Sequence, residues 1–220
     1  LYNNLRDHGQ KGLSIEALSG VDIALWDILG KYFNVPVYKL LGGAYREKVQ
    51  AYATGFYRRK NYRGVKDAVD EALCYLEKGF KAMKIKIGFD LREDVANVKA
   101  IRGAVGDDIL IMVDPNHAYD AATAISIGKK LESCGIYWFE EPVPPEDIEG
   151  YLEVKQALNI PIAGGEAEFT KFGFRHLISK RAVDIVQPDC CVTGGLTEAK
   201  KIATLAQAWN IQCIPHVWGS

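Results

Sequence analysis

The sequence predicts an α/β protein with a (β/α)8-type TIM barrel, and three observations predict this class. From Val49 onward, strand-like apolar segments alternate with amphipathic helical segments. Such strands pair in parallel, because a parallel neighbour needs a crossover connection. Several expected strands, such as 109–113, are continuous apolar runs, as expected when both faces are covered. The nearly constant repeat length and the lack of a glycine-rich nucleotide-binding turn favour a barrel over an open sheet.

The first part of the chain predicts the end of another unit. An amphipathic helix is expected over residues 14–31, because apolar side chains recur there at helical spacing. Ser14 is its expected N-cap. Pro36 and the pair Gly42-Gly43 then interrupt the chain.

The remaining elements follow at regular spacing. Strands are expected at 49–54, 81–87, 109–114, 136–140, 160–165, 182–187 and 211–215. Helical patterns are clearest around 65–76, 95–105 and 121–131. The chain begins at Leu1 without a methionine and stops at Ser220 within the pattern, so we expect a piece of a longer protein, truncated after strand seven.

Composition limits the possible partners. The chain has 220 residues, of which 48% are hydrophobic and 25% charged, as in ordinary globular proteins. Its formal net charge of −1, without a basic stripe, argues against nucleic acid or an anionic membrane as a partner. The apolar segments are too short to span a bilayer, and none has the pattern of a signal peptide. We therefore expect a cytoplasmic protein.

The five cysteines form no C-x-x-C pair, and most lie in apolar segments. They are Cys74, Cys134, Cys190, Cys191 and Cys213. We expect buried free thiols in a reducing compartment rather than metal ligands or nucleophiles.

Three carboxylates follow three consecutive expected strands. Asp114 ends one strand, Glu140 ends the next, and Glu166 follows the third, with 26 residues from each acid to the next. Barrel enzymes keep their active sites at this rim. Converging carboxylates raise each other's pKa unless a cation joins them, and oxygen ligands favour Mg²⁺ or Mn²⁺ over zinc. Each acid alone would more often be a helix cap, but the equal spacing favours a metal site.

Two lysines alternate along the expected strand at 81–87. Because side chains alternate between the faces of a strand, Lys84 and Lys86 face the barrel interior. Burying two ammonium groups is costly unless they are used. Each would lower the pKa of the other, which suits a neutral amine acting as a base. The alternative, a solvated edge strand, conflicts with the apolar flanking residues.

A similar spacing continues to a carboxylate and an imidazole, with 23 residues from Glu166 to Asp189 and 27 from Asp189 to His216. Asp189 follows the sixth expected strand, and His216 follows the seventh. A carboxylate beside an imidazole orients the ring and raises its basicity, so we expect a dyad. Alone, His216 could equally be a rim histidine. With bases on both sides, a metal-bound substrate carboxylate would lose its α-proton, and the metal would stabilise the resulting enediolate.

These residues form motifs that resemble the mandelate racemase and muconate lactonizing branch of the enolase superfamily. The motifs are Lys84-Ile85-Lys86, Asp114-Pro115-Asn116, Glu140-Glu141-Pro142, Gly165-Glu166, Gln187-Pro188-Asp189 and Pro215-His216-Val217-Trp218. The resemblance implies that Lys86 and His216, the latter held by Asp189, are the two acid/base groups. It implies that Lys84 binds the substrate carboxylate and tunes Lys86.

The resemblance also has implications for the whole chain. Residues 1–45 look like the carboxyl-terminal part of the family's α+β capping domain, and residues 46–220 look like an incomplete barrel. Family members commonly form symmetric assemblies, which implies a homo-oligomer.

Within the branch, the sequence is most similar to galactarolactone cycloisomerases and acid-sugar dehydratases. This likeness rests on Tyr52-Ala53-Thr54-Gly55, Asn116-His117 and His216-Val217-Trp218-Gly219. Asn116 and His117 are the candidates for substrate contact, although either could equally be a loop residue.

We therefore expect a Mg²⁺-dependent lyase or isomerase that acts on a small carboxylate or lactone. A racemase or epimerase of a 2-hydroxy acid would use the same site. A Schiff-base aldolase is a remote alternative, because a barrel lysine can form an imine but the three carboxylates would have no role. An inactive barrel fragment is the non-enzymatic alternative.

Overall fold

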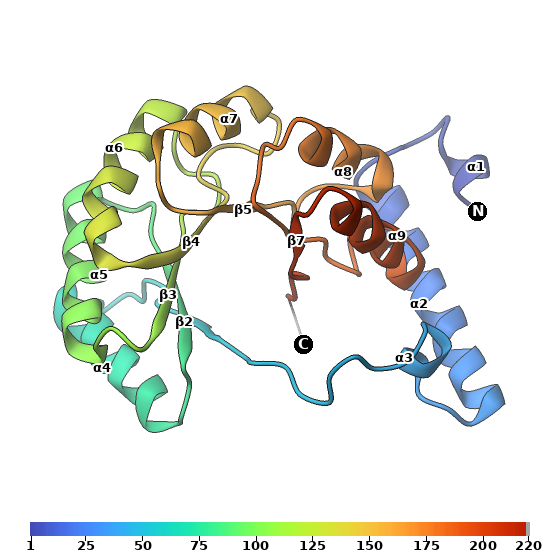
Figure 1. The fold of residues 1–220 in the computed structure, drawn as a ribbon, viewed down its shortest axis with the longest axis horizontal. Coiled ribbons are helices and arrows are strands. Elements are labelled where there is room, and N and C mark those ends of the chain that lie inside the picture. The colour runs from blue at the N-terminus through green and yellow to red at the C-terminus, as the bar shows by residue number, and fades with distance from the viewer. Residues whose placement is uncertain (219–220) are drawn as a thin grey trace. The chain divides into compact units, whose positions relative to one another are not determined.

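The computed structural model describes residues 1–218, and its strands follow the order of the chain in one seven-stranded sheet (Figure 1). The strands are β1 (Ala53–Gly55), β2 (Ala82–Lys86), β3 (Leu110–Asp114), β4 (Ile136–Glu140), β5 (Ile162–Gly164), β6 (Ile185–Val186) and β7 (Gln212–Cys213). The pairings β1–β2, β2–β3, β3–β4, β4–β5 and β6–β7 are parallel. These observations confirm the predicted α/β class and strand order. The first strand starts later than expected, at Ala53. Gly219 of the predicted motif lies outside the described residues.

The helices alternate with the strands as predicted. They are α1 (Tyr2–Leu5), α2 (Leu13–Phe33), α3 (Val37–Leu40), α4 (Val65–Glu77), α5 (Leu91–Val105), α6 (Ala121–Leu131), α7 (Ile148–Ala157), α8 (Thr170–Ser179) and α9 (Gly195–Ala208), with a 3-10 turn at Glu132–Cys134. The predicted N-cap Ser14 is wrong, because α2 begins one residue earlier and Gly12, at φ 69°, is its N-cap. None of the helices within residues 1–218 is long and apolar enough to cross a membrane.

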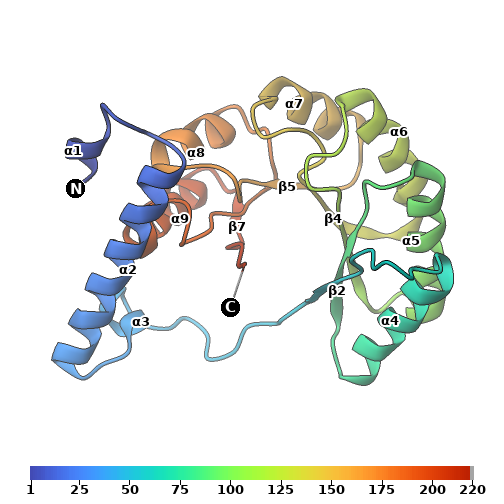
Figure 2. The ribbon, with the colours of Figure 1, turned by 180° about the vertical axis from the view of Figure 1, so that it is seen from behind.

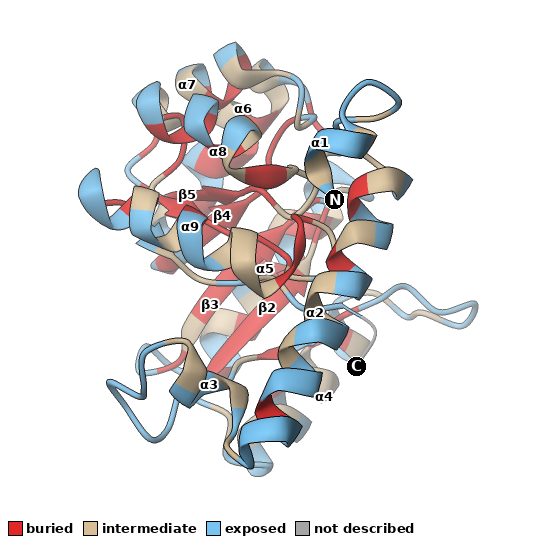
Figure 3. Ribbon diagram, turned by 90° about the vertical axis from the view of Figure 1, so that its right-hand side faces the viewer, coloured by how far each residue is buried: buried red, intermediate tan, exposed pale blue. Residues whose placement is uncertain are grey.

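The chain divides into two compact units, and the central unit comprises Gln50–Ala163. In it, α4 to α7 follow β1 to β4 in alternation (Figure 2). The strand residues are mostly buried, while the outer faces of the helices are exposed (Figure 3). Asp90 and Asp120 begin α5 and α6 by accepting hydrogen bonds from backbone N–H groups of the first turn. The parallel register then fixes which side chains meet at the strand ends.

The terminal unit comprises Leu1–Val49 and the chain from Gly164 onward. Helix α2 packs against α9, and α9 packs against α8. The Trp26 indole donates a hydrogen bond of 2.9 Å to Thr197 Oγ1, and the Thr197 N–H donates to Asp22 at 3.0 Å. These bonds fix α2 against the start of α9. The predicted boundary between residues 45 and 46 concerns the family's domains and stays a prediction.

The cysteines are free, but the expectation that they are buried is wrong for part of the set. Cys134 is buried, Cys190 and Cys213 are half-buried, and Cys74 and Cys191 are exposed. Cys74 lies in α4, where one side of the helix faces solvent.

Candidate functional site

In the central unit, Lys84 connects the two carboxylates that end β3 and β4. Its ammonium donates a hydrogen bond to Glu140 and lies 3.3 Å from Asp114 Oδ2. Asp114 and Glu140 follow the paired residues Val113 and Phe139, so the two acids end adjacent strands at the same level. Both acids are 0% exposed, and Lys84 is 3% exposed. The buried ammonium therefore compensates two buried anions.

The electrostatics around Lys84 differ from the sequence prediction. Burial alone lowers the pKa of Lys84, but Glu140 and Asp114 outweigh it and raise this pKa above its ordinary value. The expectation that Lys84 has a lowered pKa is therefore wrong for this structure. Burial also raises the pKa of Asp114, but Lys84 and Lys86 hold it below its usual range. The carboxylates dominate because both lie within ion-pair distance of the Lys84 ammonium.

Lys86 points to the same side of β2 as Lys84, as the alternation predicts. Its ammonium donates to Asp114 Oδ2 at 2.5 Å and to Asn116 Oδ1 at 2.6 Å. The Asn116 N–H donates to Asp114 Oδ1 at 2.8 Å, which folds the loop back over the strand end. The ring of Tyr57 lies 5.9 Å from Lys86 Nζ. The structure thus brings Lys86, Asp114 and Asn116 together.

Trp138 holds Glu140 from within its own strand. Its indole N–H donates to Glu140 Oε2 at 2.9 Å, and both side chains are buried. Because residues two apart share a face of a strand, Trp138 and Glu140 point in the same direction. Sequence reasoning did not include Trp138, although its two-residue spacing from Glu140 was the signal.

His117 pairs with Glu141, a residue of the Glu140-Glu141-Pro142 motif to which the sequence analysis gave no role. His117 Nε2 lies 2.9 Å from Glu141 Oε2, and the His117 N–H donates to the Glu141 backbone carbonyl at 3.0 Å. Glu141 is 0% exposed. Asn116, His117 and Glu141 have φ values of 47°, 64° and 38°, which side-chain-bearing residues adopt rarely. The turn at Glu141 ends the strand alternation, so the pattern could not place its side chain.

In the terminal unit, His216 lies between two carboxylates. Its Nδ1 is 2.8 Å from Asp189 Oδ2, and its Nε2 is 3.3 Å from Glu166 Oε2. Asp189 and His216 also form a parallel β-bridge, which aligns the ends of β6 and β7. Asp189 Oδ1 accepts from the Cys191 N–H at 2.7 Å. The predicted neighbours Asp189 and His216 are thus in contact, with Glu166 on the other side of the ring.

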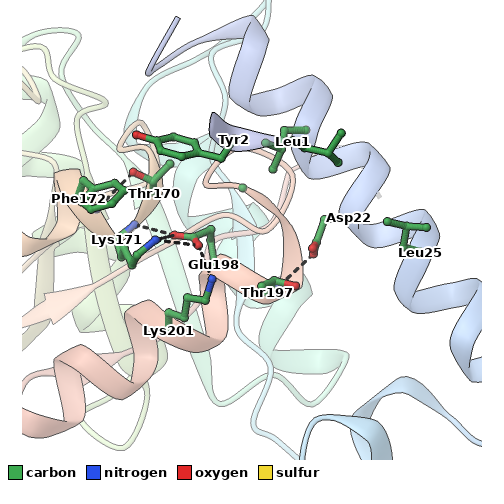
Figure 4. Close-up of a pocket in the computed structure, with 12 residues that line it drawn as sticks. Leu1, Tyr2, Asp22, Leu25, Thr170, Lys171, Phe172, Thr197, Glu198 and Lys201 are labelled. Carbon is green, nitrogen blue, oxygen red and sulfur yellow. Dashed lines mark hydrogen bonds and ion pairs between the residues drawn. The ribbon is translucent and has the colours of Figure 1, made fainter. Parts of the chain in front are cut away.

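A separate cavity of about 280 Å³ lies beside α2, α8 and α9 (Figure 4). Its charged groups pair with one another: Glu198 lies 3.2 Å from Lys171 Nζ and 2.8 Å from Lys201 Nζ. No predicted site residue is among the described residues that line it. The cavity is therefore lined by other residues than those at the strand ends.

The alternating parallel fold, with polar side chains at its strand ends, defines an α/β protein built from parallel β/α units. Residues 67–220 match the family described as enolase C-terminal domain-like. Residues 5–42 match the mandelate racemase / muconate lactonizing enzyme N-terminal domain. The chain therefore belongs to the mandelate racemase and muconate lactonizing branch of the enolase superfamily, as its motifs predicted.

Two relatives indicate which members of the branch are similar. The D-galactarolactone cycloisomerase of Agrobacterium fabrum is 49% identical over 220 residues, which are 100% of this chain and 58% of the relative. The arabinonate dehydratase of Saccharolobus solfataricus is 42% identical over 217 residues, which are 98% of this chain and 58% of the relative. The chain thus spans less than two thirds of the length of these enzymes.

Solved structures confirm the fold class. The 3,6-anhydro-D-galactonate cycloisomerase from Zobellia galactanivorans has a TM-score of 0.95 and 47% identity, covering 100% of this chain and 61% of its own. An enolase from Bradyrhizobium complexed with magnesium and mandelic acid has a TM-score of 0.90 and 35% identity, covering 98% of this chain and 59% of its own.

Proposed function

We propose that the full-length protein is a Mg²⁺-dependent lyase or isomerase that removes the proton next to a carboxylate of a sugar acid or its lactone. The observation that carries this proposal is the pair of buried carboxylates, Asp114 and Glu140, flanked by Lys84 and Lys86. The names of the similar enzymes, a cycloisomerase and a dehydratase, support the same reaction class.

We further propose that Asp114, Glu140 and Glu166 hold the cation, with Mn²⁺ as an alternative to Mg²⁺. In the parallel register Glu140 pairs with Ala163, and Glu166 follows Ala163 by three residues along the chain. The oxygen-only donor set fits a hard divalent cation. When bound, such a cation supplies Lewis-acid stabilisation of the charge that develops on the substrate carboxylate.

The protein side chains supply binding and proton transfer. Lys84 is a donor to the substrate carboxylate, and Asn116 and His117 contact the remainder of the substrate. Asp189 accepts a hydrogen bond from His216 Nδ1, so the lone pair of Nε2 is available to take a proton. Lys86 or His216 removes the α-proton. In a β-elimination, the C–H electrons then form a C=C bond, the β C–O bond breaks, and the leaving oxygen takes up a proton from the other group.

A substrate screen with the full-length protein and Mg²⁺ tests this proposal. Proton NMR in D₂O separates exchange of the α-proton from elimination or ring opening. Elimination or ring opening supports a dehydratase or cycloisomerase, whereas exchange alone supports the racemase or epimerase alternative. If acid sugars and lactones give neither exchange nor product, the proposed chemistry is wrong.

The metal assignment has its own test. Glu166→Gln is expected to lose turnover and its dependence on Mg²⁺. Glu168→Gln is the matched control, because Glu168 pairs with Lys11 at 2.8 Å and has no proposed role at the metal. Undiminished activity in Glu166→Gln would exclude this ligand. The predicted homo-oligomer and cytoplasmic location stay predictions.

A further inference from the structure

The loop between β1 and α4 carries an unusual density of positive charge. Residues 56–64 include four cationic side chains within six positions, namely Arg58, Arg59, Lys60 and Arg63. The loop leaves the carboxyl end of β1, the end at which the neighbouring strand β2 carries Lys86. The cationic loop therefore lies at the same end of the sheet as Lys86, which has a proposed role in the reaction.

Both ends of the loop are anchored. The buried Phe56 has a φ of 65°, and its N–H donates to Glu71 Oε1 at 2.8 Å. Arg58 lies 2.7 Å from Glu93 Oε2, and its guanidinium carbon is 4.4 Å from the centre of the Phe89 ring. Arg63 pairs with Asp67 at 2.7 Å. Two of the four cations therefore have a carboxylate partner that also fixes the loop.

The tip of the loop keeps its charge uncompensated. Arg59 and Lys60 are exposed, and neither forms an ion pair with a carboxylate within residues 1–218. Both follow Tyr57, whose ring lies 5.9 Å from Lys86 Nζ. Two residues of extended chain span at most about 7 Å and three at most about 11 Å, so the flexible side chains of Arg59 and Lys60 are within reach of a substrate held at Lys86.

We propose that Arg59 and Lys60 select sugar acids that carry a second anionic group at the end remote from the reacting carboxylate. A dicarboxylic sugar acid has this group, whereas the corresponding aldonic acid has a neutral hydroxymethyl. The inference rests on the proposed function, because the reacting end is assigned to Lys84 and Lys86. The remote group takes no part in the chemistry, so its contacts stabilise ground state and transition state equally.

This role predicts a particular kinetic signature. Uniform binding changes KM and leaves kcat unchanged, unlike the loss of an acid/base group. The preference also falls with ionic strength, because charges at an exposed tip are screened within about 10 Å at 0.1 M salt.

The experiment compares galactarate with galactonate, using the full-length protein and Mg²⁺. These two acids differ only in the terminal carboxylate. The unmodified protein is expected to favour galactarate by about tenfold in both kcat/KM and dissociation constant, which corresponds to about 1.4 kcal/mol. The double variant Arg59→Gln/Lys60→Gln is expected to lose this preference through KM. The control Lys78→Gln/Lys81→Gln also removes two positive charges, from the segment before β2, and is expected to keep the preference for galactarate.

The outcomes separate this inference from the proposed function. Turnover of both acids with equal KM, or a preference that survives in the double variant, would overturn the role of the loop and leave the proposed function intact. If neither acid is turned over, the wider screen of acid sugars and lactones decides the proposed function, and titration calorimetry with the same two acids decides the role of the loop. Tighter binding of 6-phosphogluconate than of gluconate, lost in the double variant, would support the loop and extend its ligands to a terminal phosphate.

Discussion

Replacing Lys84 with methionine tests whether this ammonium stands in for part of the charge of a metal ion. Methionine keeps an unbranched apolar side chain but removes the positive charge between Asp114 and Glu140. Both acids are completely buried, so the variant removes the counter-ion that they share, while Asp114 keeps its ion pair with Lys86.

The expected loss is large. Removing one partner of a buried ion pair costs about 3–5 kcal/mol, because the charge of the remaining partner stays buried. For the 220-residue chain, each kcal/mol lowers Tm by about 2–4 °C, so the metal-free variant should melt about 6–20 °C below the unmodified chain.

Thermal unfolding in EDTA measures the loss of stability, and thermal unfolding with Mg²⁺ measures the change in metal binding. A cation at one hundred times its Kd adds about 2.7 kcal/mol of stability. Because Lys84 no longer repels the cation, Lys84→Met is expected to bind Mg²⁺ more tightly and to gain more in Tm than the unmodified protein. Lys81→Met, which alters an exposed lysine beside the same strand, should change neither value. Equal Mg²⁺ shifts in the two proteins, or full stability of Lys84→Met in EDTA, would refute the reasoning.

Two further predictions concern the terminal unit and the thiols. Burial raises the pKa of Glu198, but Lys201 and Lys171 outweigh burial and lower this pKa below its ordinary value. The ion pairs of Glu198 therefore stabilise the fold fully above about pH 4.3, the ordinary pKa of a glutamate. This stabilisation is lost as the pH falls through the lowered pKa. Glu198→Gln is therefore expected to lose about 1–2 kcal/mol of unfolding free energy at neutral pH and much less near pH 3 in urea titrations; a pH-independent loss would contradict this. Burial raises the pKa of Cys213 to about 11, so a thiol reagent at pH 8 should modify the exposed Cys74 and Cys191 first, as mass spectrometry would show; early labelling of Cys213 would disprove it.

The sequence predicts elements that depend on local periodicity. Lys84 and Lys86 were expected on one side of their strand because the alternation is regular, and both ammonium groups contact Asp114. The contact between Asp189 and His216 was expected because parallel strands align their carboxyl ends, and the bridge between these residues aligns β6 and β7.

Features that depend on three-dimensional contacts were not predictable in the same way. The predicted direction of the Lys84 pKa shift was wrong because the strand alternation indicates only Lys86 as a charged neighbour, whereas in the structure Glu140 and Asp114 lie beside the Lys84 ammonium. The contact between His117 and Glu141 was missed because left-handed backbone at both residues ends the alternation.

The left-handed backbone at positions 116, 117 and 141 has a consequence for protein engineering. β-Branched side chains are strongly disfavoured in this conformation, whereas glycine, asparagine and aspartate tolerate it. In a saturation library at these positions, many members would fail because the chain cannot adopt the turn, before any change in chemistry is sampled. A selection for altered specificity should therefore score folded yield alongside turnover, or vary the loop tip at positions 59 and 60 instead.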